Sequence, residues 1–342
     1  MELYELNPCQ DDRWPDLVER SQCSSVFHSR SWLAALCQTY GYEPVAFTDS
    51  RPGEALRNAL VFCRIKSWIT GRRLVSLPFS DHCDPLVENA AALSEMLASL
   101  KNRTGREAEY IEVRPRTKLS TQGFDQVAAF EWHAIDLCRD LSEIFAHFHP
   151  SHTQRTIRRA ERAGLQIETG RTARLVEDFY MLHALTRRRH GVPVQPLYWF
   201  RSLVKYFGDR MTIYLSRHEG VPASAILTMS HGTTLVFKYG GSNVAFNRFG
   251  GSCPLFWKAI QDAKAARLTE FDLGRSDVNN EGLIAFKDHL GARRTSLNYY
   301  RYAARPPKLI ARWTITVGKA VYPLVPTRIQ ARIGSGLYGH FG

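Results

Sequence analysis

The chain lacks a long apolar run and an export signal. Its 342 residues are 44% hydrophobic, yet no stretch approaches the roughly 20 apolar residues that a membrane-spanning helix needs. The first residues, Met1 to Leu6, are acidic and have neither the basic nor the apolar block of a signal peptide. We therefore expect a cytoplasmic protein, and its length indicates two domains.

Motifs for metal binding and for nucleophilic catalysis are also missing. The seven cysteines form no C-x-x-C pair, so we interpret them as reduced, mostly buried side chains. The one dense histidine group, His147, His149 and His152, could bind a metal, but no carboxylate or cysteine lies within it. We expect no metal site. Gly-x-Ser-x-Gly is absent, and Cys83 would point to the opposite face of a strand from His82.

Positive charge is concentrated in the second half. Residues 1–150 contain 16 Lys/Arg and 21 Asp/Glu, whereas residues 151–342 contain 29 and 12. An anionic ligand is therefore expected in the second half. A helix starting near Ser151 would turn Ile157 and Ala160 toward the core and carry four arginines, namely Arg155, Arg158, Arg159 and Arg162. Such a row is usually a solvated face, and the alternative is contact with phosphates of tRNA or a lipid head group.

A glycine-rich loop between a strand and a helix is the most informative stretch. Residues 233–239 alternate as a strand does, and Gly250 and Gly251 precede a helix with Ser252 as its expected N-cap and Pro254 in its first turn. A helix N-terminus presents unpaired N–H groups to a phosphate or pyrophosphate. The alternative is that the two glycines only turn the chain.

The two halves are predicted to repeat one order of elements. The first half has expected strands over 3–6, 44–48, 56–66, 72–77, 108–114 and 131–137, and helices over 11–20, 31–40, 90–101 and 140–149. The second half has expected strands over 165–169, 211–217, 223–229, 233–239, 268–273 and 294–302, and helices over 173–189, 196–207, 254–267 and 283–290. No repeat is visible at the residue level.

This order, with a glycine loop after the fourth strand, resembles the GNAT acyltransferase fold. Two copies in tandem resemble the Fem-type family, which builds peptidoglycan cross-bridges. Arg248-Phe-Gly-Gly-Ser-Cys253 is similar to the acyl-CoA pyrophosphate motif, with cysteine as its last residue. Phe271-Asp-Leu-Gly-Arg-Ser276, followed by Phe286-Lys287 and Gly291, resembles a pattern of Fem-like proteins of envelope and exopolysaccharide systems.

The resemblance implies an α/β chain with mixed sheets and two tandem GNAT-like domains. Residues 1–138 would form a domain without the phosphate loop, since only Phe79-Ser-Asp-His-Cys-Asp-Pro precedes its helix, and would serve acceptor binding. Residues 139–302 would form the donor domain. Residues 303–342, which contain no acidic residue, would pack on the body or contact the membrane surface.

The resemblance also implies the residues of the site. The acyl carbonyl would be held by backbone N–H groups where the fourth and fifth strands of the second half separate, near 239–242 and 272–275. Catalytic candidates are Lys287, Asp272 and Tyr239; donor-binding candidates are Arg248, Gly250, Gly251, Ser252, Arg275 and Ser276; acceptor-binding candidates are Asp81, Arg187 and His190. Asp272 could instead form a structural pair with Arg275, and spacing alone predicts an exposed Lys287.

The expected reaction transfers an acyl or aminoacyl group to an amine of an envelope or exopolysaccharide precursor, at the inner face of the membrane if that precursor is lipid-linked. The donor is acyl-CoA, as Arg248 to Cys253 indicate, or aminoacyl-tRNA, as the basic half indicates; no cofactor is tightly bound. The competing interpretation is a non-enzymatic RNA-binding or regulatory module. The chain lacks a recognised RNA-reading motif, which disfavours it.

Overall fold

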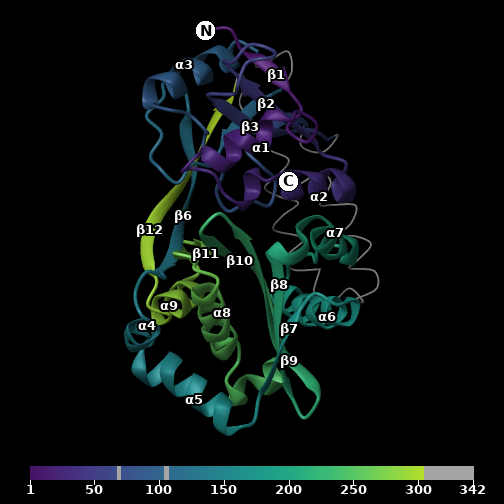
Figure 1. Ribbon diagram of the computed structural model, residues 1–342, viewed down its shortest axis with the longest axis vertical. Coiled ribbons are helices and arrows are strands. Elements are labelled where there is room, and N and C mark those ends of the chain that lie inside the picture. The colour runs from purple at the N-terminus through teal and green to yellow at the C-terminus, as the bar shows by residue number, and fades with distance from the viewer. Residues whose placement is uncertain (68–70, 104–107, 304–342) are drawn as a thin grey trace. The chain divides into compact units, whose positions relative to one another are not determined.

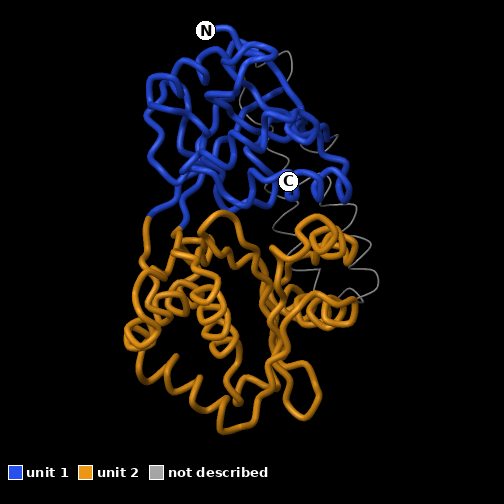
Figure 2. Tube along the Cα trace, viewed as in Figure 1, with its two compact units in different colours: residues 1–130, 296–316, 335–342 blue, residues 131–295, 317–334 orange. Residues whose placement is uncertain are grey.

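The computed structural model describes residues 1–67, 71–103 and 108–303, which form two compact units (Figure 2). Unit 1 contains residues 1–130 and 296–303, and unit 2 contains residues 131–295. The division between the units falls inside a long strand, β6 (Asp125–Asp136). The predicted C-terminal segment lies outside the described residues except for Ala303. Among the described residues, no helix is long and apolar enough to cross a membrane.

Unit 1 has the predicted elements with small shifts at their ends. Two helices are capped as their sequences indicate, since Ser29 accepts a hydrogen bond from Trp32 and Asn89 accepts one from Ala92. The elements are β1 (Tyr4–Leu6), α1 (Arg13–Arg20), α2 (Arg30–Tyr40), β2 (Glu43–Thr48), β3 (Ala59–Ser67), β4 (Gly71–Val75), α3 (Ala90–Lys101) and β5 (Tyr110–Val113).

Unit 2 repeats this order after an additional helical region. That region comprises α4 (Leu141–His147), the π-helical turn η2 (Pro150–Gln154) and α5 (Arg155–Arg162), so the basic helix begins four residues later than expected. The repeat comprises β7 (Gln166–Gly170), α6 (Ala173–Arg189), α7 (Leu197–Phe207), β8 (Met211–His218), β9 (Val221–His231), β10 (Thr234–Ser242), α8 (Cys253–Ala265), β11 (Glu270–Asp277), α9 (Glu281–His289) and β12 (Arg293–Ala303). Strand β11 continues past Gly274, where the sequence predicted its end.

The last strand of each repeat pairs in the sheet of the other repeat. The strand order is β1-β2-β3-β4-β5-β12 in unit 1 and β6-β11-β10-β9-β8-β7 in unit 2. Strand β12 pairs with β5 from Tyr300 opposite Val113 to Ala303 opposite Tyr110. Each repeat keeps one parallel pair, β4 with β5 and β10 with β11, joined through α3 and α8. Strands β6 and β12 are therefore exchanged between the two repeats.

The sheet of unit 2 is covered by helices on both faces. Helices α8 and α9 lie on one face, and α6 and α7 lie on the other (Figure 1). The core under α8 is apolar and aromatic, with Phe256, Ile260, Phe271 and Leu273 all buried. This packing fixes the helix that follows the glycine loop.

Candidate functional site: the separating strands of unit 2

Strands β10 and β11 pair only at their beginnings. Their parallel register covers three positions and ends with Val236 opposite Asp272. Strand β10 continues beside β9 as far as Ser242, and that register skips Lys238 between Phe237 and Tyr239. The two strands therefore separate in the region that the resemblance to the GNAT fold implied, with Asp272 at the last paired position. Irregular registers of this kind are common beside active sites.

The loop after β10 leads into the N-terminus of α8. Ser252 is the N-cap residue, and its carbonyl accepts hydrogen bonds from Leu255 and Phe256, although its side chain makes no capping bond. The carbonyl of Gly251 accepts a hydrogen bond of 2.8 Å from the Ser224 hydroxyl on β9. The loop is thus tied to the sheet by its backbone.

The two loop glycines have different surroundings. A Cβ atom at Gly250 would lie 2.7 Å from the Cβ atom of Ala160 and 3.1 Å from the carbonyl oxygen of Thr156. At Gly251, with φ of +53°, a Cβ atom would meet nothing within 4 Å. Gly250 therefore allows close packing against α5, whereas Gly251 leaves open space in front of the helix.

The start of α8 has the features of an anion site. Within the described part of the chain, the N–H groups of Gly251, Ser252 and Cys253 have no hydrogen-bond acceptor. Nearby, Arg248 is exposed and its guanidinium lies 4.7 Å from the ring centre of Phe249, which stacks on His218. A phosphate placed here would meet N–H groups, the helix dipole and a cation.

Lys287 is buried, which corrects the exposure expected from spacing. Its side chain is 2% exposed, and its Nζ donates to the carbonyls of Gly274 at 2.9 Å and Arg275 at 3.0 Å. Phe286 anchors the helix against Phe256 with a ring-centre distance of 5.5 Å. The ammonium group therefore reaches the backbone of β11.

Asp272 is buried and accepts two hydrogen bonds. Its Oδ1 atom lies 2.8 Å from Nε1 of Trp132 and 2.7 Å from the amide nitrogen of Gly274. Gly274 has a φ of +70°, a conformation that favours glycine. In the same strand, the Ser276 hydroxyl is buried without a hydrogen-bond partner among the described residues.

Tyr239 lies in an aromatic cluster on the α6 face. Its hydroxyl accepts a hydrogen bond of 3.0 Å from Nε1 of Trp199, and its ring packs edge-to-face on His183 and Phe200. Only 8% of Tyr239 is exposed. Its observed contacts stabilise β10 against α6 and α7.

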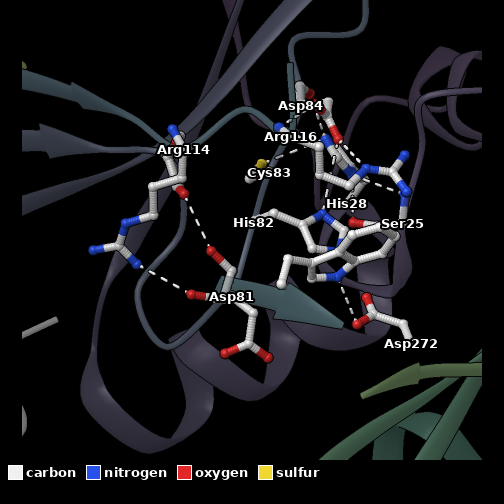
Figure 3. A network of polar contacts seen from close by, with 12 residues as sticks. Ser25, His28, Asp81, His82, Cys83, Asp84, Arg114, Arg116 and Asp272 are labelled. Carbon is white, nitrogen blue, oxygen red and sulfur yellow. Dashed lines mark hydrogen bonds and ion pairs between the residues drawn. The ribbon is translucent and has the colours of Figure 1, made fainter. Parts of the chain in front are cut away.

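The candidate Asp81 lies in a strained loop of unit 1 (Figure 3). Leu77 and Phe79 have φ values of +63° and +62°, which are unusual for bulky residues. Buried Arg114 holds this loop by donating to the carbonyls of Leu77 at 2.9 Å and Ser80 at 3.4 Å. Tyr299 donates to the carbonyl of Asp81 at 2.7 Å.

A buried Cys83–His28 pair was not foreseen from the sequence. Their Sγ and Nε2 atoms are 3.4 Å apart, but Nε2 also faces the Asp84 carbonyl at 2.9 Å and therefore carries the proton. Burial raises the pKa of the Cys83 thiol well above its ordinary value. The pair is unsuited to nucleophilic catalysis, as is Cys253, whose pKa burial raises to about 11.

The other acceptor candidates lie at the end of α6. Arg187 donates to the carbonyl of Pro193 at 3.0 Å, and His190 is exposed. Burial, together with Arg189 and Arg187, lowers the pKa of His190. A neutral imidazole at neutral pH is therefore favoured there.

The predicted histidine group packs beside a fourth histidine, from α9. His289 of α9 lies beside His149 and His152, with ring centres 4.4 and 4.6 Å apart. However, no cluster of three or more His, Cys, Asp or Glu side chains in the described ranges could hold a metal ion. The four arginines of α5 are exposed and Ile157 and Ala160 are buried, as predicted.

Comparison with known proteins agrees with this geometry. Residues 151–287 match the family model described as "Acetyltransferase (GNAT) domain". The structure called "Crystal structure of FemX" superposes with a TM-score of 0.68 at 14% identity, covering 93% of this chain and 100% of that one. The chain therefore shares the fold of that structure over nearly its whole length. A tandem GNAT protein from the clavulanic acid biosynthesis pathway gives a TM-score of 0.53 at 12% identity, covering 90% of this chain and 99% of its own.

One curated relative of this chain has a described activity. It is the UDP-N-acetylmuramoylpentapeptide-lysine N(6)-alanyltransferase of Weissella viridescens, 26% identical over 142 residues. The match covers 41% of this chain and 42% of the relative, so this chain matches less than half of that protein's length.

Sequence reasoning missed the side chains that hold the backbone of the site. His183 and Thr186 of α6 bond to the end of β10, and Trp132 of β6 bonds to Asp272. The only signal for His183 was its place on an apolar helical stripe with Leu175, Phe179 and Leu182, where histidine must find polar partners.

Proposed function

We propose that this protein is an N-acyltransferase that moves an acyl or aminoacyl group onto an amine of a cell-envelope precursor. The observation that carries the proposal is the separation of β10 from β11 directly before a glycine loop and helix N-terminus. The GNAT match over residues 151–287 and the alanyltransferase activity named for the relative support the same reaction class.

The separated strands fit the needs of acyl transfer. An attacking amine must be neutral, and the carbonyl oxygen must gain hydrogen-bond donors as negative charge develops on it. Backbone N–H groups of β10, beyond its last pairing with β11, would supply those donors. The amine–carbonyl bond forms as the bond to the donor's sulfur or ribose oxygen breaks, and the amine proton leaves with that group or with solvent.

The donor's phosphates would bind at the loop before α8. Gly250, Gly251 and Ser252 would contribute backbone N–H groups and shape, and Arg248 would contribute charge. Arg275 and Ser276, at the end of β11, remain donor-binding candidates, because the buried Ser276 hydroxyl still has hydrogen bonds to offer.

Lys287 and Asp272 would act mainly through Gly274. Their contacts support positioning of the β11 backbone, and the Lys287 charge would add favourable potential for an oxyanion. Tyr239 would position β10 through its contacts with α6 and α7. No side chain would then need to be a nucleophile.

Acceptor binding is proposed for Asp81 in unit 1 and for Arg187 and His190 in unit 2. A carboxylate suits an ammonium group before it loses its proton, and Arg187 suits a phosphate or carboxylate of the acceptor. If the precursor is lipid-linked, the protein would work at the inner face of the membrane.

The choice between the two donors depends on the basic helix α5. The Arg248 motif favours acyl-CoA, whereas four exposed arginines on α5 favour the phosphates of tRNA. Gly250 packs against α5 at Ala160, so this helix adjoins the donor loop. Reversing the charge of Arg155 and Arg159 should weaken binding of aminoacyl-tRNA much more than binding of acyl-CoA.

Thermal unfolding with each donor tests the proposed function. A ligand that binds only the folded state raises the melting temperature, so saturating acyl-CoA or aminoacyl-tRNA should do so. The Gly251→Val variant, if folded, should lose most of that rise. If neither donor stabilises the protein while unrelated RNA binds with a steep salt dependence, the protein is an RNA-binding module and the proposed enzyme activity is wrong.

A further inference from the structure

Beyond the point where β11 separates from β10, the end of β10 forms hydrogen bonds with side chains of a helix. A strand edge that loses its neighbour has unpaired N–H and C=O groups that need new partners. Helix α6 provides them: Nδ1 of His183 lies 3.0 Å from the Gly240 carbonyl, and the Thr186 hydroxyl accepts from the Ser242 amide at 2.9 Å. The same hydroxyl donates to the Ser242 carbonyl at 3.3 Å.

Close packing keeps α6 at this distance. A Cβ atom at Gly241 would lie 2.4 Å from the His183 amide nitrogen and 2.4 Å from the Leu182 carbonyl carbon. Glycine at this position therefore lets the strand backbone touch the helix backbone. Gly240, Gly241 and Ser242 thus contact α6 through three consecutive residues of β10.

The protonation state of His183 is set by its surroundings. Burial and Arg187 lower its pKa to about 4, so the ring is neutral and has one N–H group. Because a carbonyl can only accept, a bond to Gly240 requires the proton on Nδ1. Nε2 lies 3.0 Å from Oε1 of Gln195, and it accepts from this side chain only when the amide is turned so that its NH2 group faces the ring. Stacking on Phe179, at 5.7 Å between ring centres and 10° between planes, fixes the ring.

We propose that His183 and Thr186 are positioning residues that take the place of β11 and keep the end of β10 turned away from it. This would fix the position of the β10 backbone where the proposed acyl carbonyl binds, beside the irregular register between Phe237 and Tyr239. This inference rests on the proposed acyl transfer for its kinetic consequence. Its structural part, the replacement of a strand by helix side chains, is independent of the reaction.

Substitutions of His183 separate the hydrogen bond to β10 from the packing of the ring. Asparagine can place an N–H donor near the position of Nδ1, whereas glutamine places its amide near Nε2, and phenylalanine keeps the stacking but has no polar atom. We expect H183N to retain most of kcat, and H183Q and H183F to lose roughly tenfold to a hundredfold in kcat with little change in donor KM. Folded H183F with full kcat, or equal losses in H183N and H183Q, would overturn the positioning role.

Hydrogen exchange provides the readout that needs no activity. Thr186→Val keeps the shape of the side chain and removes the hydroxyl, so the amide of Ser242 should exchange at least tenfold faster, while amides of β9 stay protected. Unchanged exchange at Ser242 would contradict the replacement of β11 by α6. If the wild-type protein transfers no acyl group from either donor, the proposed function fails, and the exchange result still decides the structural part.

Discussion

Asp272 and Lys287 hold the same residue, Gly274, through its two backbone polar groups. The Asp272 carboxylate accepts from the Gly274 N–H at 2.7 Å, and the Lys287 ammonium donates to its C=O at 2.9 Å. Gly274 has a positive φ and follows the last residues of β11 that pair with β10. The two charged side chains therefore fix the backbone where the strands separate, and their first effect is on shape.

Removing the Lys287 charge should impair both activity and stability. Lys287→Met should lower kcat/KM by on the order of a hundredfold, comparable with the loss of one oxyanion donor. The carbonyls of Gly274 and Arg275 lose a donor, so the free energy of unfolding should fall by about 1–3 kcal/mol. Steady-state kinetics and urea unfolding measure the two effects.

The control is Lys258→Met on α8, which breaks only a half-exposed pair with Asp262. It should leave activity unchanged and stability within about 0.5 kcal/mol. Nearly full activity in Lys287→Met would show that the lysine has no part in the site.

Two substitutions of Asp272 distinguish positioning from acid–base catalysis. Asparagine can still accept from Trp132 and Gly274, so Asp272→Asn should keep most of kcat, whereas Asp272→Ala should lose it and be less stable. A general base would be lost equally in both variants. Equal loss of kcat in the two variants, with Asp272→Asn fully stable, would therefore assign the carboxylate to proton transfer.

Substitutions of the two loop glycines should have different effects. Gly250→Ala places a Cβ atom against Ala160 and should lower the melting temperature by several degrees. Gly251→Val meets no atoms within 4 Å, and its side chain would occupy the position of the donor's phosphates, so it should raise donor KM. Valine at a φ of +53° should also lower the free energy of unfolding by about 1–3 kcal/mol. Calorimetry and donor titration measure these effects in the two variants. An unchanged donor KM in folded Gly251→Val would show that the two glycines only turn the chain.

Acid should destabilise the protein through His183. Its folded-state pKa of about 4 lies below the ordinary value of 6.5, so the unfolded state binds more protons between these two pH values. Stability is fully present above pH 6.5 and falls as the pH drops toward 4, by about 3 kcal/mol for this residue.

Because burial also lowers the pKa of His133 to about 4, part of the acid sensitivity should remain without His183. His183→Phe should be less stable at neutral pH but show a shallower loss on acidification, measured by denaturant unfolding from pH 7 to 4.5. Parallel pH profiles for the variant and the wild type would contradict the buried neutral imidazole.

Asp81 should affect the acceptor and not the donor. Asp81→Asn should raise acceptor KM roughly tenfold or more and leave the donor-induced rise in melting temperature unchanged. Arg114→Met tests whether Arg114 stabilises the loop that contains Asp81. The substitution removes the hydrogen bonds that Arg114 donates to the carbonyls of Leu77 and Ser80, which help to keep the loop in its strained conformation. An unaltered acceptor KM in Asp81→Asn would exclude the loop from acceptor binding.

Local signals predicted most elements and the loop of the site. Thr172 caps α6 as threonine typically does, and residues 173–189 form a helix with both predicted ends. Non-local pairing was not predictable, because exchange of β6 and β12 between repeats depends on which strand edges meet. For the same reason β6 begins at Asp125, six residues before the predicted start.

The roles of single side chains were harder to predict than the fold. Spacing placed Lys287 on the surface, but carbonyls from β11, more than ten residues away in sequence, bury its ammonium. The two glycines of one motif have different surroundings because α5 packs against only one of them. His183 belongs to no sequence motif. Its role depends on the separation of β11 from β10, which are strands of another part of the sequence.

Direct observation of transfer tests the central claim. The purified protein is incubated with radiolabelled acetyl-CoA or alanyl-tRNA and an amine-bearing UDP-sugar pentapeptide, and the acceptor is analysed by mass spectrometry. We expect an added acyl or alanyl mass in amide linkage with one donor, strongly reduced in Lys287→Met and Gly251→Val. Absence of product with both donors, together with salt-sensitive binding of unrelated RNA, would show that the protein is not an acyltransferase of this kind.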